Sequence, residues 1–352
     1  MSSFESSPVL KKAKLSDAVS DKVIGTHSGT FQADEAMGVW MLRQIPAYRN
    51  SAVVRSRDLQ VLAALDIVID VAGEYDHAAL RYDHHQRGYD ERFDAGKKDK
   101  EGRCTKLSAS GLVYRHYGKE VLKAYYPDIT DDSLALAYKK IYNSLLEALD
   151  AIDTGVEIFP EGVEQVYSDA TGLSRRVSRL NPRWNEVGAA GETPDSDQRF
   201  ELASAACGQD FVAVMTSIVE SDLPARDFVE RALLKRHEVD PSGEILVLES
   251  GGLPWRNHLY DLEKEHSIDT LIKFVLYTDQ SGMWRIQAVT VEGQSFVNRL
   301  SLPEEWRGVR DQDLEALTKI PGSRFVHAAG FIGGNSTFEG AKQMAVVALT
   351  RK

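Results

Sequence analysis

Residues 23–46 read VIGTHSGTFQADEAMGVWMLRQIP, and this stretch decides the fold. Val23–His27 is an apolar run that ends at Ser-Gly-Thr, so it predicts a buried strand closed by a turn. From Asp34 the apolar residues recur at spacings of three and four, which is the period of a helix: Met37, Trp40, Met41 and Ile45. Pro46 ends that helix. The stretch therefore predicts a strand–turn–helix unit.

The same alternation continues outward along the chain. Ala52–Arg55 and Ile67–Val71 read as two further strands, and 110–117, 133–150 and 174–180 read as helices. Short apolar strands that alternate with helices predict a doubly wound, mostly parallel sheet with helices on both faces. The fold class is therefore α/β.

The second half of the chain has a different character. After Pro241-Ser242-Gly243, residues 245–248, 271–277 and 283–291 are β-like, and helical patterns return at 311–319 and from Glu339. This half predicts an α+β domain. The expected division is a disordered tail at 1–21, a first domain at 22–190, a helical connector at 191–240 that breaks near Pro224, and a second domain at 241–352.

The composition restricts the partners of the chain. Its net charge of −11 is unusual for a protein that grips nucleic acid through a broad basic surface. Contacts with nucleic acid should therefore be local and mediated by metal ions and a few arginines. The two cysteines are too few for a disulfide framework, and no run approaches the roughly 18 apolar residues of a membrane span.

Residues 81–88 read RYDHHQRG and place three groups with metal-binding or proton-transfer chemistry side by side: Asp83, His84 and His85. Carboxylate and imidazole are ligands that hold Mn²⁺ or Zn²⁺. Ligands in doubly wound sheets gather at the carboxyl ends of strands. His27, Asp70 and His84 all occupy such positions, so we expect one shared metal site.

Two further acids are candidate ligands. Asp34 opens the first helix, where the helix dipole favours a carboxylate even without a metal. Near the end of the helix at 133–150, Asp150 and Asp153 lie three residues apart on one face, and either can be the ligand. Gly155 ends that helix and favours Asp153.

These residues resemble the MYG (melanocyte-proliferating-gene) family of the DHH phosphoesterase superfamily, from about residue 23 to the C-terminus. Several separate stretches carry the resemblance: 25–31 (GTHSGTF), 34–36 (DEA), 66–71 (DIVIDV), 82–88 (YDHHQRG), 179–182 (RLNP), 277–280 (YTDQ), 303–308 (PEEWRG) and 325–334 (FVHAAGFIGG). Their number and order make the signal specific.

The resemblance implies an N-terminal DHH domain with two ions of the Mn²⁺ type and a C-terminal DHH-associated domain that closes over the substrate. The implied metal positions are His27, Gln32, Asp34, Asp70, His84 and Asp153, with Asp70 bridging the ions. His85 is expected to orient a ligand or steady a phosphate. The implied substrate contacts are Arg179, His327, Gly330, Gly333, Gly334 and Asn335, the last four through a phosphate-binding loop. The implied catalytic group is Asp70, His84, His85, Arg179 and His327.

Gln32 departs from the family pattern, because a histidine is usual at this position. An amide oxygen is a weak ligand for Mn²⁺, so we expect one ion to bind less tightly or not at all. The chain is then a reduced-activity variant. Either a natural difference or a deliberate substitution explains the glutamine.

The implied activity is phosphodiester hydrolysis by a 3′–5′ exonuclease that acts on RNA and releases nucleoside monophosphates. Two alternatives stay open: a phosphodiesterase for short oligonucleotides or small nucleotides, and an inactive RNA-binding protein. The expected location is intracellular, in the nucleus or cytoplasm, and the resemblance also implies the mitochondrion. The sequence predicts no membrane association and leaves the oligomeric state open.

Overall fold

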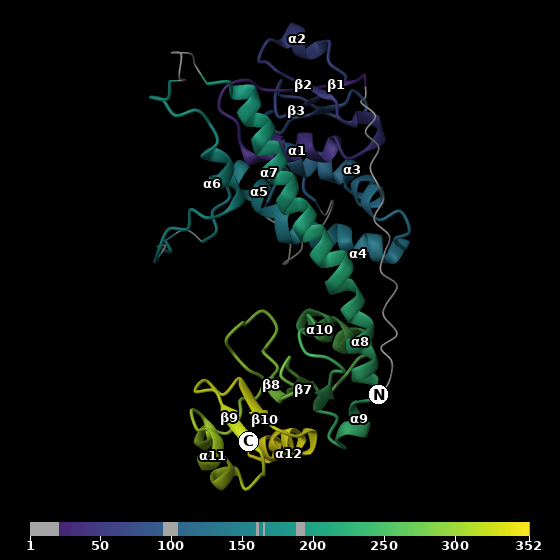
Figure 1. Ribbon diagram of the computed structural model, residues 1–352. Helices are drawn as coiled ribbons and strands as arrows, with labels where there is room; N and C mark the ends of the chain where they lie inside the picture. Colours follow the sequence, from purple (N-terminus) through teal and green to yellow (C-terminus); the bar gives the residue numbers. More distant parts are fainter. Residues whose placement is uncertain (1–20, 94–104, 160–161, 165, 188–193, 352) are drawn as a thin grey trace. The chain divides into compact units, whose positions relative to one another are not determined.

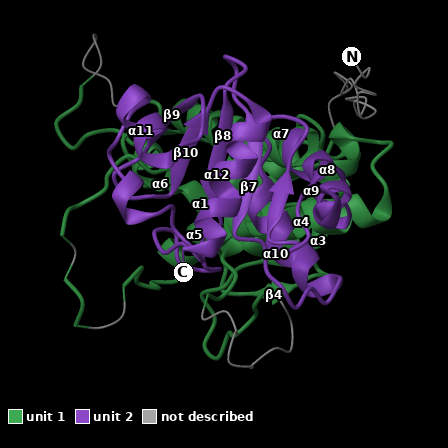
Figure 2. Ribbon diagram, turned by 90° about the horizontal axis from the view of Figure 1, so that it is seen from below, with its two compact units in different colours: residues 1–220 green, residues 221–352 purple. Residues whose placement is uncertain are grey.

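The computed structural model describes residues 21–93, 105–159, 162–164, 166–187 and 194–351. The chain forms two compact units, Met1–Glu220 and Ser221–Lys352 (Figures 1 and 2). Each unit contains one five-stranded sheet. The predicted α/β class, with a parallel-rich first sheet and a separate second sheet, is confirmed.

The first sheet has the order β2-β1-β3-β5-β4. Its strands are β1 (Val23–Thr26), β2 (Ala52–Arg55), β3 (Ile67–Ile69), β4 (Tyr75–Asp76) and β5 (Arg81–Tyr82). β1 runs parallel to β2 and β3, and β3 runs parallel to β5, whereas β4 is an antiparallel edge strand. The carboxyl ends of the three central strands therefore meet at one edge of the sheet.

Helices cover both faces of this sheet, and two glycines allow them to pack closely. A Cβ at Gly25 in β1 would meet Leu62 and Leu65 at the end of α2. A Cβ at Gly38 in α1 would meet Ile69 of β3. Gly25 pairs with Val68, so Ile69 points to the opposite face because side chains alternate along a strand. α2 and α1 therefore pack on opposite faces (Figure 1).

The helical segments of the first unit include those that the sequence predicted, with different ends, and also helix α2, which the sequence did not predict. They are α1 (Ala33–Leu42), the 3₁₀ turn η1 (Pro46–Tyr48), α2 (Leu59–Ala63), α3 (Ala109–Tyr125), α4 (Asp131–Ile141), the π-helical turn η2 (Tyr142–Leu146), α5 (Glu147–Asp153), α6 (Leu173–Ser178), α7 (Ser196–Ser217) and the π-helical turn η3 (Ile218–Asp222), which crosses the unit boundary. The helix expected over 133–150 is thus two helices joined by a π turn. Asp153, rather than Asp150, is its last residue.

One long helical stretch passes between the two units in the sequence. The α7–η3–α8 segment, Ser196–Leu234, is long and apolar enough to cross a membrane by length and composition, and 44% of its most apolar window is buried. Core helices also meet this criterion, and α7 packs along α1 with Phe200 edge-to-face on Phe31. Pro224 follows shortly after the π-helical turn η3 and does not break the stretch, since a π turn re-registers the backbone hydrogen bonds near the proline.

The second unit contains a mixed sheet of order β6-β7-β8-β10-β9, in which only β6 and β7 are parallel. Its elements are α8 (Leu223–Leu234), α9 (Arg236–Val239), β6 (Ile245–Val247), α10 (Trp255–Glu265), β7 (Phe274–Thr278), β8 (Trp284–Ala288), η4 (Glu304–Trp306), α11 (Asp311–Thr318), β9 (Ser323–Val326), β10 (Ile332–Asn335) and α12 (Phe338–Thr350). Its hydrophobic core includes Trp306, Phe274 and Met344.

Candidate metal centre

The expected meeting of strand ends is confirmed in the first unit. His27 follows β1 directly, Asp70 follows β3, and His84 lies two residues beyond β5. The three side chains belong to groups of potential ligands whose donor atoms lie within 4.8 Å of one another. Parallel strand order, rather than nearness in the sequence, brings them together.

Asp70 belongs to three overlapping sets of potential ligand atoms. Its Oδ2 lies 3.4 Å from Nε2 of His27, and its Oδ1 lies 3.8 Å from Nδ1 of His84. One set consists of His27, Glu35 and Asp70, another of Asp34, Asp70, His84 and Asp153, and the third adds Asp83 and His85 to Asp70 and His84. We call the six residues of the first two sets the acidic centre. A carboxylate shared by two ligand sets has the arrangement that bridges two cations.

The backbone at Asp70 is held in a conformation that side chains rarely adopt. Its φ of 57° lies in the left-handed region, which costs free energy for a residue other than glycine. The conformation ends β3 immediately after Ile69, one reason why the strand is shorter than the apolar run at 67–71.

Several buried polar atoms of the acidic centre have no hydrogen-bond partner among the described residues: Oδ1 of Asp70, Oε2 of Glu35, Oδ2 of Asp153 and Nδ1 of His84. Asp153 Oδ2 lies 3.0 Å from His84 Nε2, yet this contact lacks the alignment of a hydrogen bond. Unpaired buried polar atoms are costly, and a bound cation would satisfy them. Because carboxylates and imidazoles also suit divalent ions, the acidic centre fits metal binding.

The pKa values of the acidic centre reflect the burial and the close packing of its carboxylates. Burial, followed by the charges of Asp153 and Asp70, raises the pKa of Asp34 well above its usual range. Burial likewise raises the pKa of Asp70 and Glu35. Although burial opposes a charged imidazole, hydrogen bonds and charge from Asp70 and Glu35 raise the pKa of His27 to about 10. A group of acids that resists ionisation in this way is one that cations would stabilise.

Asp83 organises the turn that carries the two histidines. Its Oδ1 accepts hydrogen bonds from the backbone N–H groups of His84 and His85 and lies 2.6 Å from Nδ1 of His85. Its Oδ2 accepts the N–H of Gly73. Although burial opposes ionisation, these bonds lower the pKa of Asp83. His85 remains 62% exposed, so it can reach a substrate.

The carboxylate of Asp34 is held by the first residues of α3. Oδ1 accepts the hydroxyl of Ser108 and the N–H of Ser110, and Oδ2 accepts the N–H of Ala109. Asp34 lies in the first turn of α1 but caps a different helix. Two bonds occupy Oδ1, so Oδ2 keeps the capacity to bind an ion.

The structure separates Asp150 from Asp153. Asp150 is fully buried; its Oδ1 accepts the N–H of Ser108 and lies 2.6 Å from the hydroxyl of the same residue, and its Oδ2 accepts the hydroxyl of Tyr142. Protein donors thus occupy Asp150, whereas Asp153 faces Asp70 and His84 in the acidic centre. Asp153 is the ligand candidate that the geometry favours.

Sequence reasoning missed two residues of this site. Glu35 is buried with its Oε1 3.2 Å from Nε2 of His27, and Ser108 links Asp34 to Asp150. Glu35 was detectable, since it is a second acid in the first turn after a strand-end histidine. Nothing in the sequence marked Ser108 as a site residue, because it lies far from Asp34 and Asp150 in the chain and resembles an ordinary helix cap.

A cavity of about 350 Å³ adjoins the acidic centre, and its lining includes Gln32, Asp34, Asp153 and Arg175. Gln32 is exposed, so its predicted role as a weak ligand stays a prediction. Arg179, the expected phosphate contact, is not in this lining. It is exposed and donates to the carbonyl of Ala170.

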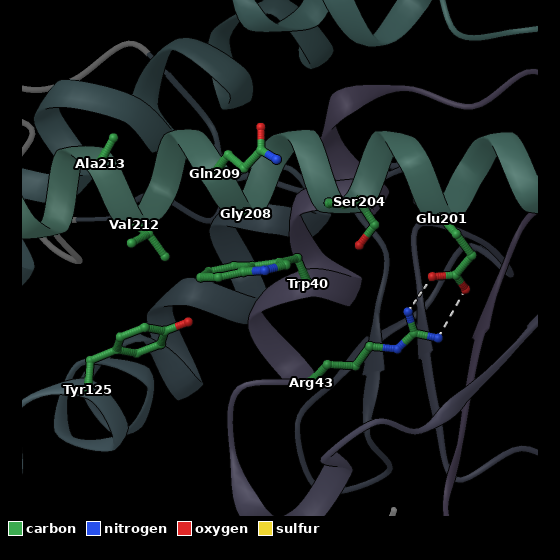
Figure 3. A pocket seen from close by; sticks show the side chains of 10 residues that line it. Trp40, Arg43, Tyr125, Glu201, Ser204, Gly208, Gln209, Val212 and Ala213 are labelled. Carbon is green, nitrogen blue, oxygen red and sulfur yellow. Dashed lines mark hydrogen bonds and ion pairs between the residues drawn. The ribbon is translucent and has the colours of Figure 1, made fainter. Parts of the chain in front are cut away.

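A larger cavity, about 560 Å³, lies between α1, α3 and α7 (Figure 3). The indole of Trp40 lies near Tyr125, and Arg43 forms an ion pair with Glu201 at its edge. No residue of the acidic centre lines it. Size alone therefore does not identify the site.

The glycine-rich segment at 330–335 corrects another expectation. It was expected to be a phosphate-binding loop, but Ile332–Asn335 forms β10, which pairs with β8 and β9. A central strand commits its backbone groups to neighbouring strands, so Gly333 and Gly334 do not offer a free phosphate nest. Gly330 donates to His327, and the buried amide of Asn335 donates to Pro321.

His327 lies at the end of β9 in the second unit. It is exposed, its Nδ1 accepts the N–H of Ala329, and its ring contacts Phe331. Its predicted contact with substrate stays a prediction.

Comparison with known proteins places this geometry in a family. The model named MYG1_exonuc, described as an uncharacterised protein family (UPF0160), matches residues 23–349. The chain belongs to this family. It is 45% identical to the MYG1 exonuclease of Homo sapiens over 351 residues, covering 99% of this chain and 91% of that protein.

Other MYG1 relatives agree over nearly the whole chain. Identity is 47% to the MYG1 exonuclease of Rattus norvegicus, with 94% of this chain and 85% of that protein covered. It is 43% to the MYG1 protein of Dictyostelium discoideum, covering 95% and 98%. The acidic centre thus lies within the part of the chain that defines the MYG1 family.

Proposed function

We propose that this chain is a metal-dependent 3′–5′ exonuclease that hydrolyses RNA and releases nucleoside monophosphates. The observation that carries the proposal is the sharing of buried Asp70 between the two ligand sets that make up the acidic centre. The exonuclease names of its mammalian relatives also support a nuclease.

The proposed centre holds two divalent ions of the Mn²⁺ type. Such ions supply an activated water and stabilise the charge that develops on the transferring phosphoryl group. The protein contributes rigid placement of the ligands. Asp70 presents one oxygen to each ligand set, and Asp34 is held by Ser108 and the start of α3. Preorganised ligands reduce the reorganisation needed during reaction.

The remaining roles follow the family resemblance. We place the chain in the DHH phosphoesterase superfamily, with His85 steadying a substrate phosphate. His327 of the second unit is proposed to contact the same substrate. The proposed location is intracellular, in the nucleus or cytoplasm with a mitochondrial fraction, which imaging of a fluorescently tagged full chain can test.

Hydrolysis of 5′-labelled RNA tests the proposal. With Mn²⁺, wild type should shorten the RNA stepwise from its 3′ end and release nucleoside monophosphates, and excess EDTA should stop the reaction. Asp70→Ala should abolish hydrolysis and lower bound Mn²⁺. Asp66→Ala is the matched control, because Asp66 is an exposed acid that accepts the N–H of Val23. Full activity in EDTA, or near-native turnover by Asp70→Ala, would refute the proposal.

A preference for short oligonucleotides is the second candidate. The cavity beside the acidic centre is near the lower end of the usual ligand-pocket range, roughly 300–1,000 Å³. Comparing Mn²⁺-dependent cleavage of a dinucleotide with cleavage of a 20-residue RNA separates the two. A much higher kcat/KM for the dinucleotide would favour a small-substrate phosphodiesterase.

A further inference from the structure

The cavity beside the acidic centre has two chemically different sides. Asp34 and Asp153 form the side that faces the metal ligands. Leu149 and Ile152 of α5 contribute apolar surface, and the side chain of Ile152 remains 57% exposed. A ligand in the cavity can therefore contact the ions with a phosphate while an apolar part of it covers Ile152.

Among the described residues that line the cavity, Arg175 of helix α6 is the only arginine. Three arginines lie in or directly after α6, and two of them have partners. Arg176 pairs with Asp210 at 2.9 Å, and Arg179 donates to Ala170. Within the described part of the chain, the guanidinium of Arg175 has no hydrogen-bond or ion-pair partner, and it lines the cavity with the hydroxyl-bearing Ser174 and Ser178.

Arg175 is solvent-exposed, so its guanidinium can bind an anion that enters the cavity. Asp34 and Asp153 line the same cavity as Arg175, yet neither forms an ion pair with it. Guanidinium groups bind phosphate oxygens strongly through charge-assisted hydrogen bonds. The arrangement suits a phosphate held between Arg175 and the cations of the acidic centre.

We propose that this cavity binds the terminal nucleotide of the substrate, with its base against Ile152 and Leu149 and Arg175 beside its phosphate. This inference rests on the proposed exonuclease function. It assigns phosphate recognition to Arg175 in place of Arg179. It also predicts that the released nucleoside 5′-monophosphate binds at the same place as a product.

Calorimetric titration with adenosine 5′-monophosphate tests the inference without turnover, because this probe contains no phosphodiester. With Mn²⁺ present, Arg175→Ala should weaken binding about tenfold or more, as expected for loss of a charge-assisted contact. Adenosine, which has no phosphate, should bind both proteins equally. EDTA should abolish binding of the monophosphate to wild type, since carboxylates without cations repel a phosphate.

Arg176→Ala is the matched control, because Arg176 is the adjacent arginine and pairs with Asp210 outside the cavity lining. It should bind the monophosphate within about twofold of wild type. Ile152→Ser should weaken binding of both probes. Equal affinities of the two arginine variants, or no binding to wild type at millimolar concentration, would overturn the inference.

The two proposals can fail separately. If Arg175→Ala leaves monophosphate binding and the KM for RNA unchanged while wild type degrades RNA, the cavity assignment is wrong and the exonuclease stands. If wild type does not hydrolyse RNA but the variants show the expected binding differences, the nuclease proposal fails and the nucleotide site stands.

Discussion

Replacement of Asp150 by asparagine should reveal a buried proton next to the acidic centre. Asp150 is fully buried, and the hydroxyl of Ser108 contacts both Asp150 Oδ1 and Asp34 Oδ1. One hydroxyl proton cannot serve two ionised carboxylates. A neutral Asp150 resolves this by donating to Ser108, which then donates to Asp34. Asparagine preserves such a donor, so Asp150→Asn is the variant that isolates the proton.

The size of the effect follows from the pKa of Asp150. Burial raises this pKa from 3.8 to about 7, in spite of the hydrogen bonds from Ser108 and Tyr142. The folded protein then binds a proton that the unfolded chain releases. This contribution to stability is fully present below pH 3.8, declines as pH rises toward 7, and is lost above pH 7. It amounts to about 4 kcal/mol over the whole window and to about 2 kcal/mol between pH 5 and pH 7.

Hydrogen exchange measured by mass spectrometry provides the assay, because it reports opening of the first unit alone. The free energy of opening is compared for α1 and α3 peptides of wild type and Asp150→Asn in EDTA. The free energy of opening of wild type minus that of Asp150→Asn should decrease by about 2 kcal/mol from pH 5 to pH 7. Asp132→Asn, which removes an exposed acid from α4, controls for the loss of one carboxylate. A difference that does not change with pH would refute a protonated Asp150.

Four further changes test other parts of the structure. Gly111→Ala should destabilise the first unit by about 1–3 kcal/mol, because the added Cβ would collide with Asp150 Oδ1. Gly172→Ala is the control, since a Cβ at that position meets no other atom, and thermal melting compares the two variants. Arg299→Ala should lower the free energy of unfolding by about 3–5 kcal/mol, because it leaves Glu263 buried without its bidentate partner. Loss of the exposed Lys264–Glu292 pair through Lys264→Ala should cost at most about 1 kcal/mol in the same melting experiment. Gln32→His should raise the Mn²⁺ content and the hydrolysis rate; elemental analysis that finds equal metal in both proteins would remove Gln32 from the ligand set.

The limits of sequence reasoning are visible at individual residues. The helical period of Met37 and Trp40 predicted α1, and the apolar run ending at Asp70 predicted β3. The glycine-rich segment at 330–335 was misjudged, because glycine also occurs in strands whose neighbours approach closely. A Cβ at Gly333 would come within 3.1 Å of the carbonyl of Phe325, and one at Gly334 would crowd the ring of the same residue. Such crowding depends on how β10 pairs with its neighbour β9, which the glycines themselves do not reveal.

The sequence by itself predicted a mostly parallel sheet and the gathering of His27, Asp70 and His84, because these residues follow strands whose carboxyl ends meet at one sheet edge. Only the tertiary structure decided between Asp150 and Asp153, which share a helix face and differ in what packs above them. It also showed that Arg175, rather than Arg179, lines the cavity beside the acidic centre, and it placed Glu35 with His27 and Asp70. These distinctions depend on which side chains are buried and on the partners that distant helices supply, and neither can be read from a local residue pattern.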